Sequence, residues 1–335
     1  MKLALPLLLA QTLSLAQIPR IGIIDFYGVR KVSEERLLKA LGAREGDPLP
    51  PSKSVVEERL EQVSGVVRAR LESVCCADGK AILFVGIEEK GAPHFNFRTP
   101  PNSEVRLPDQ VVETYRQFLA ALERAVRSGD ARDDLTRGHS LLADPECRAL
   151  QLKFEEFAKS NLKLLRDVLR ESGDDEHRSV AAYVIGYAEK KRLVVDDLQY
   201  AMQDPADAVR NNAMRALAAI AVPALKDPEL GIRVSPTWFI EMLNSIIWTD
   251  RNKAAFALVT LTESRDAEVL DQIRTSAMDS VIEMAHWKSL GHALPAFILA
   301  GRIAGVAEEE IQRAWSDGER EAVLEKARAA GRRRR

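Results

Sequence analysis

Residues that commonly carry chemistry are scarce in this chain of 335 residues, which has 3 cysteines, 5 histidines and 6% aromatic residues. Three cysteines allow at most one disulfide, which excludes a disulfide-stapled scaffold. The 48 basic and 50 acidic residues nearly cancel, so the overall charge does not favour a nucleic-acid partner. The shortage of aromatics, with alanine and leucine dominating the second half, favours closely packed helices over a β-sandwich or barrel.

Catalytic and metal-binding motifs are incomplete wherever they begin. Glu283 and His286 are spaced like half of a di-iron carboxylate motif, but no second pair exists. The sequence GHS at 138–140 begins like a nucleophile elbow, yet Leu142 stands where the last glycine should be. We therefore expect no catalytic residue, no cofactor and no bound metal.

The first 16 residues, MKLALPLLLAQTLSLA, have the pattern of a secretory signal peptide. Lys2 precedes an apolar run, and the small residues Ser14 and Ala16 mark a cleavage site after Ala16. Polar residues interrupt the run before about 18 apolar residues are reached, which argues against a membrane-spanning helix. We expect a periplasmic or secreted mature chain without an integral membrane segment.

Residues 20–91 alternate between strand and helix signals. RIGIIDFYGV is rich in β-forming residues and ends at Gly28. SEERLLKALG follows, with Ser33 as a candidate N-cap and a glycine as its stop signal. After the turn-forming stretch GDPLPPS, Ser54 and Glu57 form a capping box for a second helix.

Two more strands complete this first module. VVRARLESVCC alternates between apolar and polar residues, which predicts one face formed by Val67, Ala69 and Leu71. The dipeptide Asp78-Gly79 is a hairpin signal, and KAILFVGIEE returns as the last strand. The sequence therefore predicts an α+β module of order β-α-α-β-β, with both helices on one face of the sheet.

This module resembles a POTRA domain, a family found in envelope assembly and secretion proteins. The resemblance rests on the strand closing at Gly28, on SEERLLKALG with the following GDPL, on VSGV before the second strand, and on the final Ile87-Glu88-Glu89. It implies an exposed second strand at residues 66–73 that could pair with an extended peptide. The candidate binding residues on that strand are Val66, Arg68, Arg70 and Glu72.

The rest of the chain is predicted to be helical. Residues 92–108 are rich in proline and have no periodicity, so we expect a linker. We expect a helical region at 109–158, repeats at 160–305, a charged helical cap at 307–330 and a basic tail at 331–335. That tail ends in Arg332, Arg333, Arg334 and Arg335, which could touch an anionic membrane surface.

Three segments of the second half align with one another at offsets of 32 and 41 residues. Arg178, Arg210 and Arg251 occupy the same position, and alanines such as Ala213 and Ala216 follow them. Unequal offsets indicate helix pairs joined by loops of variable length, which is typical of a solenoid. The segment around DPADAVRNNAMRALAAIA resembles a HEAT repeat. We therefore predict an α+β fold class, in which the small POTRA-like module is followed by an all-α HEAT-like solenoid.

The resemblance to HEAT repeats implies structural roles for the repeated positions. The arginines would brace neighbouring loops by hydrogen bonding, and the alanines would sit where helices approach closely. Two functional hypotheses remain open. The first is a non-enzymatic adaptor that binds protein partners through the sheet edge and the concave solenoid face. The alternative is a lyase-like enzyme or ligand carrier with a pocket between the helical region and the repeats.

Overall fold

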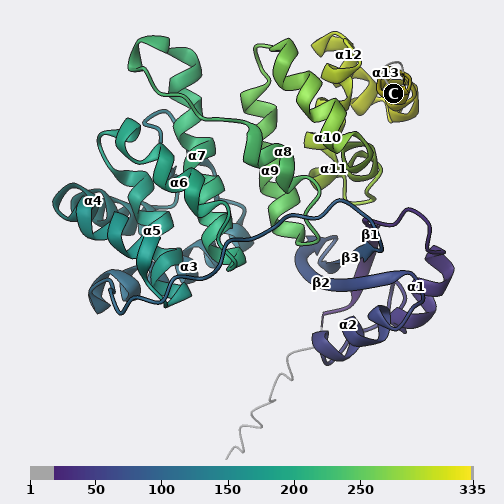
Figure 1. Ribbon diagram of the computed structural model, residues 1–335, viewed down its shortest axis with the longest axis horizontal. Helices are drawn as coiled ribbons and strands as arrows, with labels where there is room; N and C mark the ends of the chain where they lie inside the picture. Colours follow the sequence, from purple (N-terminus) through teal and green to yellow (C-terminus); the bar gives the residue numbers. More distant parts are fainter. Residues whose placement is uncertain (1–18, 333–335) are drawn as a thin grey trace, which may run out of the picture.

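The computed structural model describes residues 19–332, so the predicted signal peptide and residues 333–335 lie outside the described residues. A small module built on a three-stranded sheet adjoins a larger array of helices (Figure 1). The order of the first five elements agrees with the sequence-based prediction. They are β1 (Ile21–Tyr27), α1 (Glu34–Leu41), α2 (Lys53–Glu61), β2 (Val66–Ala77) and β3 (Lys80–Glu89).

The sheet has the strand order β1-β3-β2, with β3 parallel to β1 and antiparallel to β2. The hairpin between β2 and β3 turns at Asp78 (φ 49°) and Gly79 (φ 74°), as predicted. Both residues have positive φ, which is what a two-residue hairpin loop requires. Since β3 is central, β1 and β2 are the two edge strands.

Two local predictions for this module are wrong. Helix α2 begins after Ser52, whose side chain accepts from the backbone N–H of Val55, so the expected capping box of Ser54 and Glu57 does not form. The register of β2 shifts between Val66 and Arg68, and Val67 is therefore 55% exposed rather than facing inward. A bulge inserts one residue and ends simple alternation, which the residue pattern did not signal.

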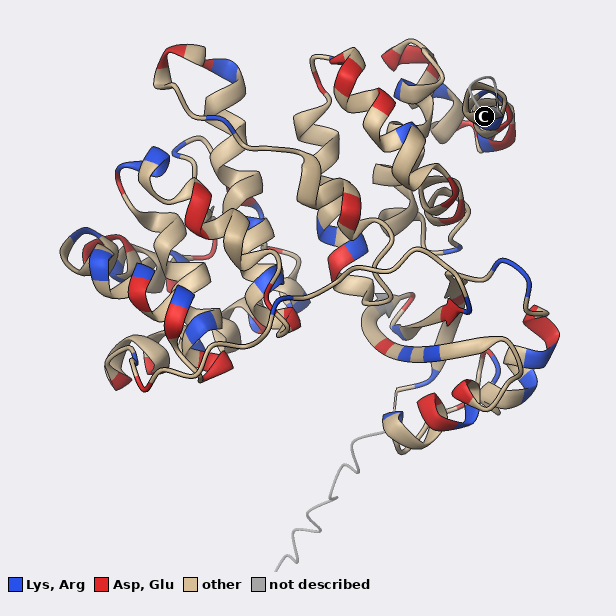
Figure 2. Cartoon of the chain, in the orientation of Figure 1, with Lys and Arg blue, Asp and Glu red and all other residues tan. Residues whose placement is uncertain are grey.

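The second part of the chain consists of helices stacked in pairs. Their bounds are α3 (Asp109–Ser128), α4 (Pro145–Glu171), α5 (Asp175–Val184), α6 (Val195–Ala201), α7 (Asp207–Lys226), α8 (Thr237–Met242), α9 (Trp248–Leu261), α10 (Ala267–Ala285), α11 (Leu290–Ile303), α12 (Glu308–Ser316) and α13 (Arg320–Arg332). The pairs are α4/α5, α6/α7, α8/α9 and α10/α11. The second helix of each pair packs against the second helix of the next pair. Basic and acidic residues are interspersed along these helices (Figure 2).

The region at 109–158 is not entirely helical. Between α3 and α4, β4 (Asp133–Asp134) pairs with β5 (Leu141–Leu142) in a two-residue ladder. Helix α4 also continues past residue 160, where the repeats were expected to begin, with a kink at Asn161. The amphipathic pattern indicated the helices, whereas so short a ladder has no periodicity to reveal it.

Helix α7 shows how a repeat buries its inner side. Val209, Ala213, Leu217 and Ile220 have no exposed surface, as their spacing along one helical face requires. Ala216 is only partly buried, although we expected it to lie on the same buried face of the helix. It lies against Gly186, where an added Cβ would come within 2.9 Å of the Ala216 Cβ.

We expect Ala213→Leu to destabilise the repeats by roughly 1–3 kcal/mol, because the enlarged side chain must fit into a closely packed interior. Ala208→Leu is the matched control, since Ala208 is exposed on the same helix. Thermal unfolding of both variants is the measurement. Equal melting temperatures would show that the helix interface around Ala213 can accommodate the larger side chain.

The sheet is covered on both faces, because the repeats pack against the face opposite α1 and α2. Leu83, Val85 and Ile87 of β3 face the two small helices, whereas Ile82 and Phe84 belong to the core of the repeats. The Phe84 ring stacks on Trp248 at a centroid distance of 4.9 Å and lies 5.0 Å from that of Trp287. A strand buried on both faces reads as a continuous apolar run, and AILFV in β3 is such a run.

Candidate functional site

A ladder of buried ion pairs joins successive repeats. The Arg178 guanidinium binds both carboxylate oxygens of Asp204 at 2.9 and 3.0 Å, from Nε and Nη2 respectively. Arg210 binds Asp250 at 2.9 Å, and these side chains are 1% and 0% exposed. Because each acid precedes or begins the next helix of the stack, every pair links one repeat to its neighbour. Each of these two arginines, which occupy equivalent positions in their repeats, thus has its carboxylate partner in the following repeat.

The third arginine of this ladder connects the repeats to the sheet module. Arg251 donates from Nη1 to Oε2 of Glu283 at 2.9 Å. The other carboxylate oxygen, Oε1, accepts from the backbone N–H groups of Gly28 at 2.7 Å and Val29 at 3.3 Å. Glu283 therefore compensates the charge of a buried arginine and binds the end of β1 at the same time.

Two other side chains of β1 fix the module to the repeats. The Tyr27 hydroxyl donates to the carbonyl oxygen of Ile246 at 2.6 Å. Asp25, which is 5% exposed, accepts from the backbone N–H groups of Lys288 and Ser289, directly before α11. Burial raises the pKa of Asp25, and these two N–H donors oppose that rise because they stabilise the ionised form. The module is thus held by buried polar contacts as well as by the apolar core.

The segment at 92–108 lies along the ladder instead of standing free. It runs from β3 past the ends of the repeat helices to α3 (Figure 1). Arg98 donates to Asp204 at 2.5 Å, so this carboxylate receives two arginines. Ser103 pairs through its backbone with the end of α4 and the residues after it: its N–H donates to the Glu171 carbonyl oxygen at 3.0 Å, and its carbonyl oxygen accepts from the N–H of Gly173 at 2.8 Å. The solenoid therefore already holds one extended segment, which belongs to its own chain.

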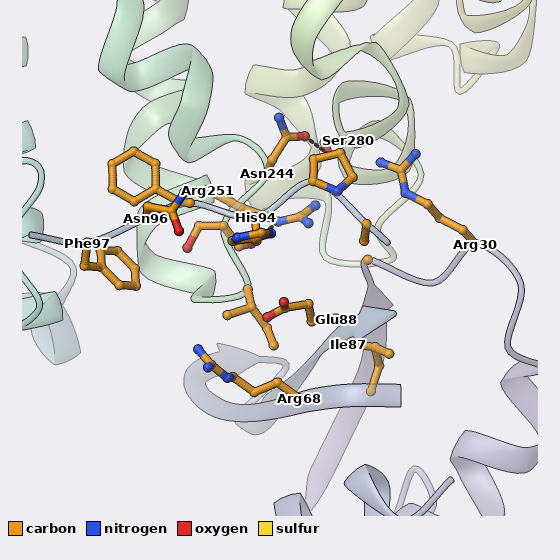
Figure 3. Close-up of a pocket in the computed structure, with 16 residues that line it drawn as sticks. Arg30, Arg68, Ile87, Glu88, His94, Asn96, Phe97, Asn244, Arg251 and Ser280 are labelled. Atoms are coloured by element: carbon orange, nitrogen blue, oxygen red, sulfur yellow. Dashed lines mark hydrogen bonds between the residues drawn. The ribbon is translucent and has the colours of Figure 1, made fainter. Parts of the chain in front are cut away.

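A cleft of about 380 Å³ opens where the sheet module, this segment and the repeats meet. Arg68 and Glu88 approach it from the sheet, His94 and Asn96 from the segment, and Asn244, Arg251 and Ser280 from the repeats (Figure 3). Arg68 and Glu88 are cross-strand neighbours in the register of β2 and β3. Among the described residues, the side chains of Arg68, Glu88, His94 and Asn96 make no hydrogen bond or ion pair.

One part of the cleft wall comes close to the sheet backbone. Gly86 of β3 meets the loop before α9, and a Cβ at Gly86 would lie 2.5 Å from the Ile246 carbonyl oxygen. Only glycine allows this loop, whose Ile246 lines the cleft, to come so near the strand. The sequence alone does not indicate this role for Gly86, since a lone glycine in a strand can mark a bulge, a bend or a close backbone approach.

The candidate binding residues on β2 are divided between two environments. Arg68 lines the cleft, whereas Val66, Arg70 and Glu72 do not. Along the outer edge of β2, the N–H groups of Ala69 and Leu71 donate to Glu61 and Glu57 of α2, at 3.0 and 2.7 Å. Peptide pairing at the middle of this edge would have to displace these two carboxylates, which leaves the cleft as the more open site.

The fragments of catalytic motifs have other partners in the structure. The Ser140 hydroxyl donates to Asp133 at 2.8 Å and makes no bond to His139. His139 is bonded to Glu155 and to Lys191 at 2.7 and 2.9 Å. Glu283 makes the contacts described above. Within residues 19–332, no group of three or more His, Cys, Asp or Glu side chains is arranged to hold a metal ion.

The centre of the chain is similar to a known family of helical repeats. Residues 162–230 match a family model for HEAT repeats. A designed armadillo repeat protein aligns with 17% identity and a TM-score of 0.36, over 58% of this chain and 96% of that chain. A computationally designed armadillo repeat protein for modular peptide recognition aligns with 15% identity and a TM-score of 0.36, over 66% and 98%. No protein with a curated description matches the chain.

The family match supports a helical repeat solenoid for the centre of the chain, and the two structural likenesses are too low to indicate a ligand. The small module has the β-α-α-β-β order of the family it resembles, but such units recur in unrelated proteins. None of the helices in the described part of the chain is both long and apolar enough to cross a membrane.

Proposed function

We propose that this protein is an exported, non-enzymatic scaffold that binds an extended segment of a partner protein in the cleft between the sheet module and the repeats. The observation that supports this proposal most is the state of the polar groups around the cleft. Buried hydrogen bonds and ion pairs fix the sheet module to the repeats, while several polar side chains that line the cleft lack partners. Arg68, Glu88, His94 and Asn96 are such side chains. A preformed, rigid site binds an extended chain at a lower entropic cost than a mobile one.

The chemistry of the cleft favours a polar peptide. Arg68 and Glu88 offer one charge of each sign, and Asn96 offers an amide that can bond to a peptide backbone. The way the chain holds its own segment at 92–108 is a precedent for binding an extended polypeptide. Export and a role in envelope assembly remain proposals, supported by the pattern of residues 1–16 and by the POTRA-like order of the module.

We expect a photo-crosslinking residue at position 94 to label one partner when the mature protein is added to an envelope extract. The same residue at position 38 is the matched control, because Leu38 is exposed on α1 away from the lining of the cleft. Arg68→Glu should reduce labelling from position 94 at least several-fold without altering the melting temperature, since Arg68 is exposed. Mass spectrometry of the adduct should identify an extended, polar peptide.

Three results would contradict this proposal. Equal labelling from positions 94 and 38 would mean that contact is unspecific. Labelling that Arg68→Glu leaves intact would place the binding site elsewhere. An adduct that maps to a helix or to the folded interior of the partner would exclude an extended segment.

A further inference from the structure

A second cavity, of about 190 Å³, lies between the helical region and the repeats. None of its lining residues lines the cleft between the sheet module and the repeats, which we call the junction cleft. Its walls come from α3, from the loop that carries β4 and β5, and from α5, α7 and α9. The apolar part of the lining includes Phe118, Leu122, Leu135, Met214 and Phe256. The Phe256 side chain is 49% exposed, which leaves an aromatic ring beside the cavity partly uncovered.

Two cationic side chains enter this apolar pocket. Lys253 and Arg215 both line it, and among the described residues neither makes an ion pair or a side-chain hydrogen bond. Burial, with the neighbouring Arg215 charge as the second cause, lowers the pKa of Lys253 to about 8. An ammonium group in such surroundings gains free energy from any anion that reaches it.

The other charged group of the pocket is Asp133. Its two carboxylate oxygens accept from the Ser140 hydroxyl at 2.8 and 2.9 Å, and burial raises its pKa. The remaining titratable lining groups are His139, whose pKa is lowered to about 4 by burial and then by Lys191, and the hydroxyls of Tyr183 and Tyr187. These three are neutral at pH 7. Two cations and one carboxylate leave one positive charge in excess, which matches a single anionic group.

We propose that this pocket binds a small apolar monocarboxylate, with its carboxylate between Lys253 and Arg215 and its hydrocarbon part against Phe118, Leu122 and Phe256. The cavity is smaller than the roughly 300–1,000 Å³ of sites for drug-sized ligands, which favours a ligand of roughly ten non-hydrogen atoms. A free straight-chain acid of medium length has this size and this single charge. The site is separate from the junction cleft, so it does not depend on the proposed scaffold function.

The test uses calorimetric titration of the full mature chain with octanoate, octan-1-ol and octylammonium at pH 7. Octanoate should bind at least ten-fold more tightly than octanol, and octylammonium should not bind measurably. Lys253→Met keeps the length of the side chain and removes its charge, and it should weaken octanoate binding at least ten-fold. Lys226→Met is the matched control, because Lys226 is exposed on α7 and does not line the pocket.

Binding should also depend on pH, mainly through Lys253. Two other groups face this region: burial lowers the pKa of His292, which is therefore neutral above pH 7, and burial lowers the pKa of Lys191, which contacts the lining residue His139, to about 7. The ammonium form predominates below the free-state pKa of about 8, so octanoate affinity should be highest there. Affinity should fall as the pH rises through the pKa of the complex, which the bound anion shifts upwards. In Lys253→Met, the affinity should be nearly constant between pH 8 and pH 10, since arginine keeps its charge and Lys191 is already mostly neutral there.

Arg215→Met provides a second variant at an exposed side chain, so the test stays decisive if Lys253→Met fails to fold. It should weaken octanoate binding while leaving the melting temperature of the free protein unchanged. Equal affinity for octanoate and octanol would overturn the proposal, as would wild-type affinity in either pocket variant. Absence of octanoate binding at millimolar concentration would also overturn it.

Discussion

Asp250→Ala should lower the free energy of unfolding by about 3–5 kcal/mol, one of the two largest effects we expect from a single substitution in this chain. Asp250 is fully buried, and its carboxylate binds the equally buried Arg210 as well as the Ser245 hydroxyl. Removing the carboxylate leaves the guanidinium in the interior without a counterion. Thermal or urea unfolding of the purified chain measures this loss.

The control for this prediction is an ion pair of similar length on the surface. Arg124 and Glu146 lie 2.7 Å apart, and both side chains are 60% exposed. Glu146→Ala should therefore change the free energy of unfolding by less than about 1 kcal/mol. If Asp250→Ala and Glu146→Ala lower the free energy of unfolding by the same amount, water must reach the buried ion pairs. The arginines would then not hold the repeats together.

The double variant Arg210→Met with Asp250→Ala separates pairing from burial. Each single change leaves one buried charged group without its partner, whereas the double change removes both charges from the interior. We expect the double variant to be more stable than Asp250→Ala alone, because the cost lies mainly in the uncompensated charge. A double variant that is as unstable as the sum of the single changes would mean that the two side chains act independently.

The sequence was sufficient to predict which residues repeat, but not what they contact. The alignment of Arg178, Arg210 and Arg251 came from local self-similarity. Their partners Asp204, Asp250 and Glu283 lie 26, 40 and 32 residues further along the chain. A pattern within one helix contains no information about which carboxylate of the next repeat will face it. Ion pairing between repeats depends on how the helices stack, and loop length alters that stacking.

The junction between the two parts was missed for a related reason. The segment at 92–108 has the composition of a linker, and composition does not distinguish a free linker from one that is packed along a surface. The second apolar face of the sheet had a detectable signal, however. Ile82 and Phe84 interrupt the expected alternation of β3, and an uninterrupted apolar strand indicates burial on both faces.

Glu283→Ala should both destabilise the chain and loosen the sheet module from the repeats. The change leaves Arg251, with 4% of its side chain exposed, without its carboxylate, and it also removes the acceptor of the Gly28 and Val29 N–H groups. Because the Glu283 side chain is itself 23% exposed, we expect a loss of about 3 kcal/mol, at the lower end for a buried pair.

Undocking of the module has its own optical signature, which separates it from general instability. Trp248 and Trp287 are buried where they meet Phe84, so loosening this contact should shift tryptophan fluorescence to longer wavelength below the melting temperature. Glu268→Ala is the matched control, since Glu268 is exposed on the same helix, α10. Glu283→Gln should fall between the two, because the amide oxygen can still accept from Gly28 but carries no charge. Wild-type fluorescence and wild-type amide exchange at Gly28 in Glu283→Ala would show that apolar packing alone holds the module in place.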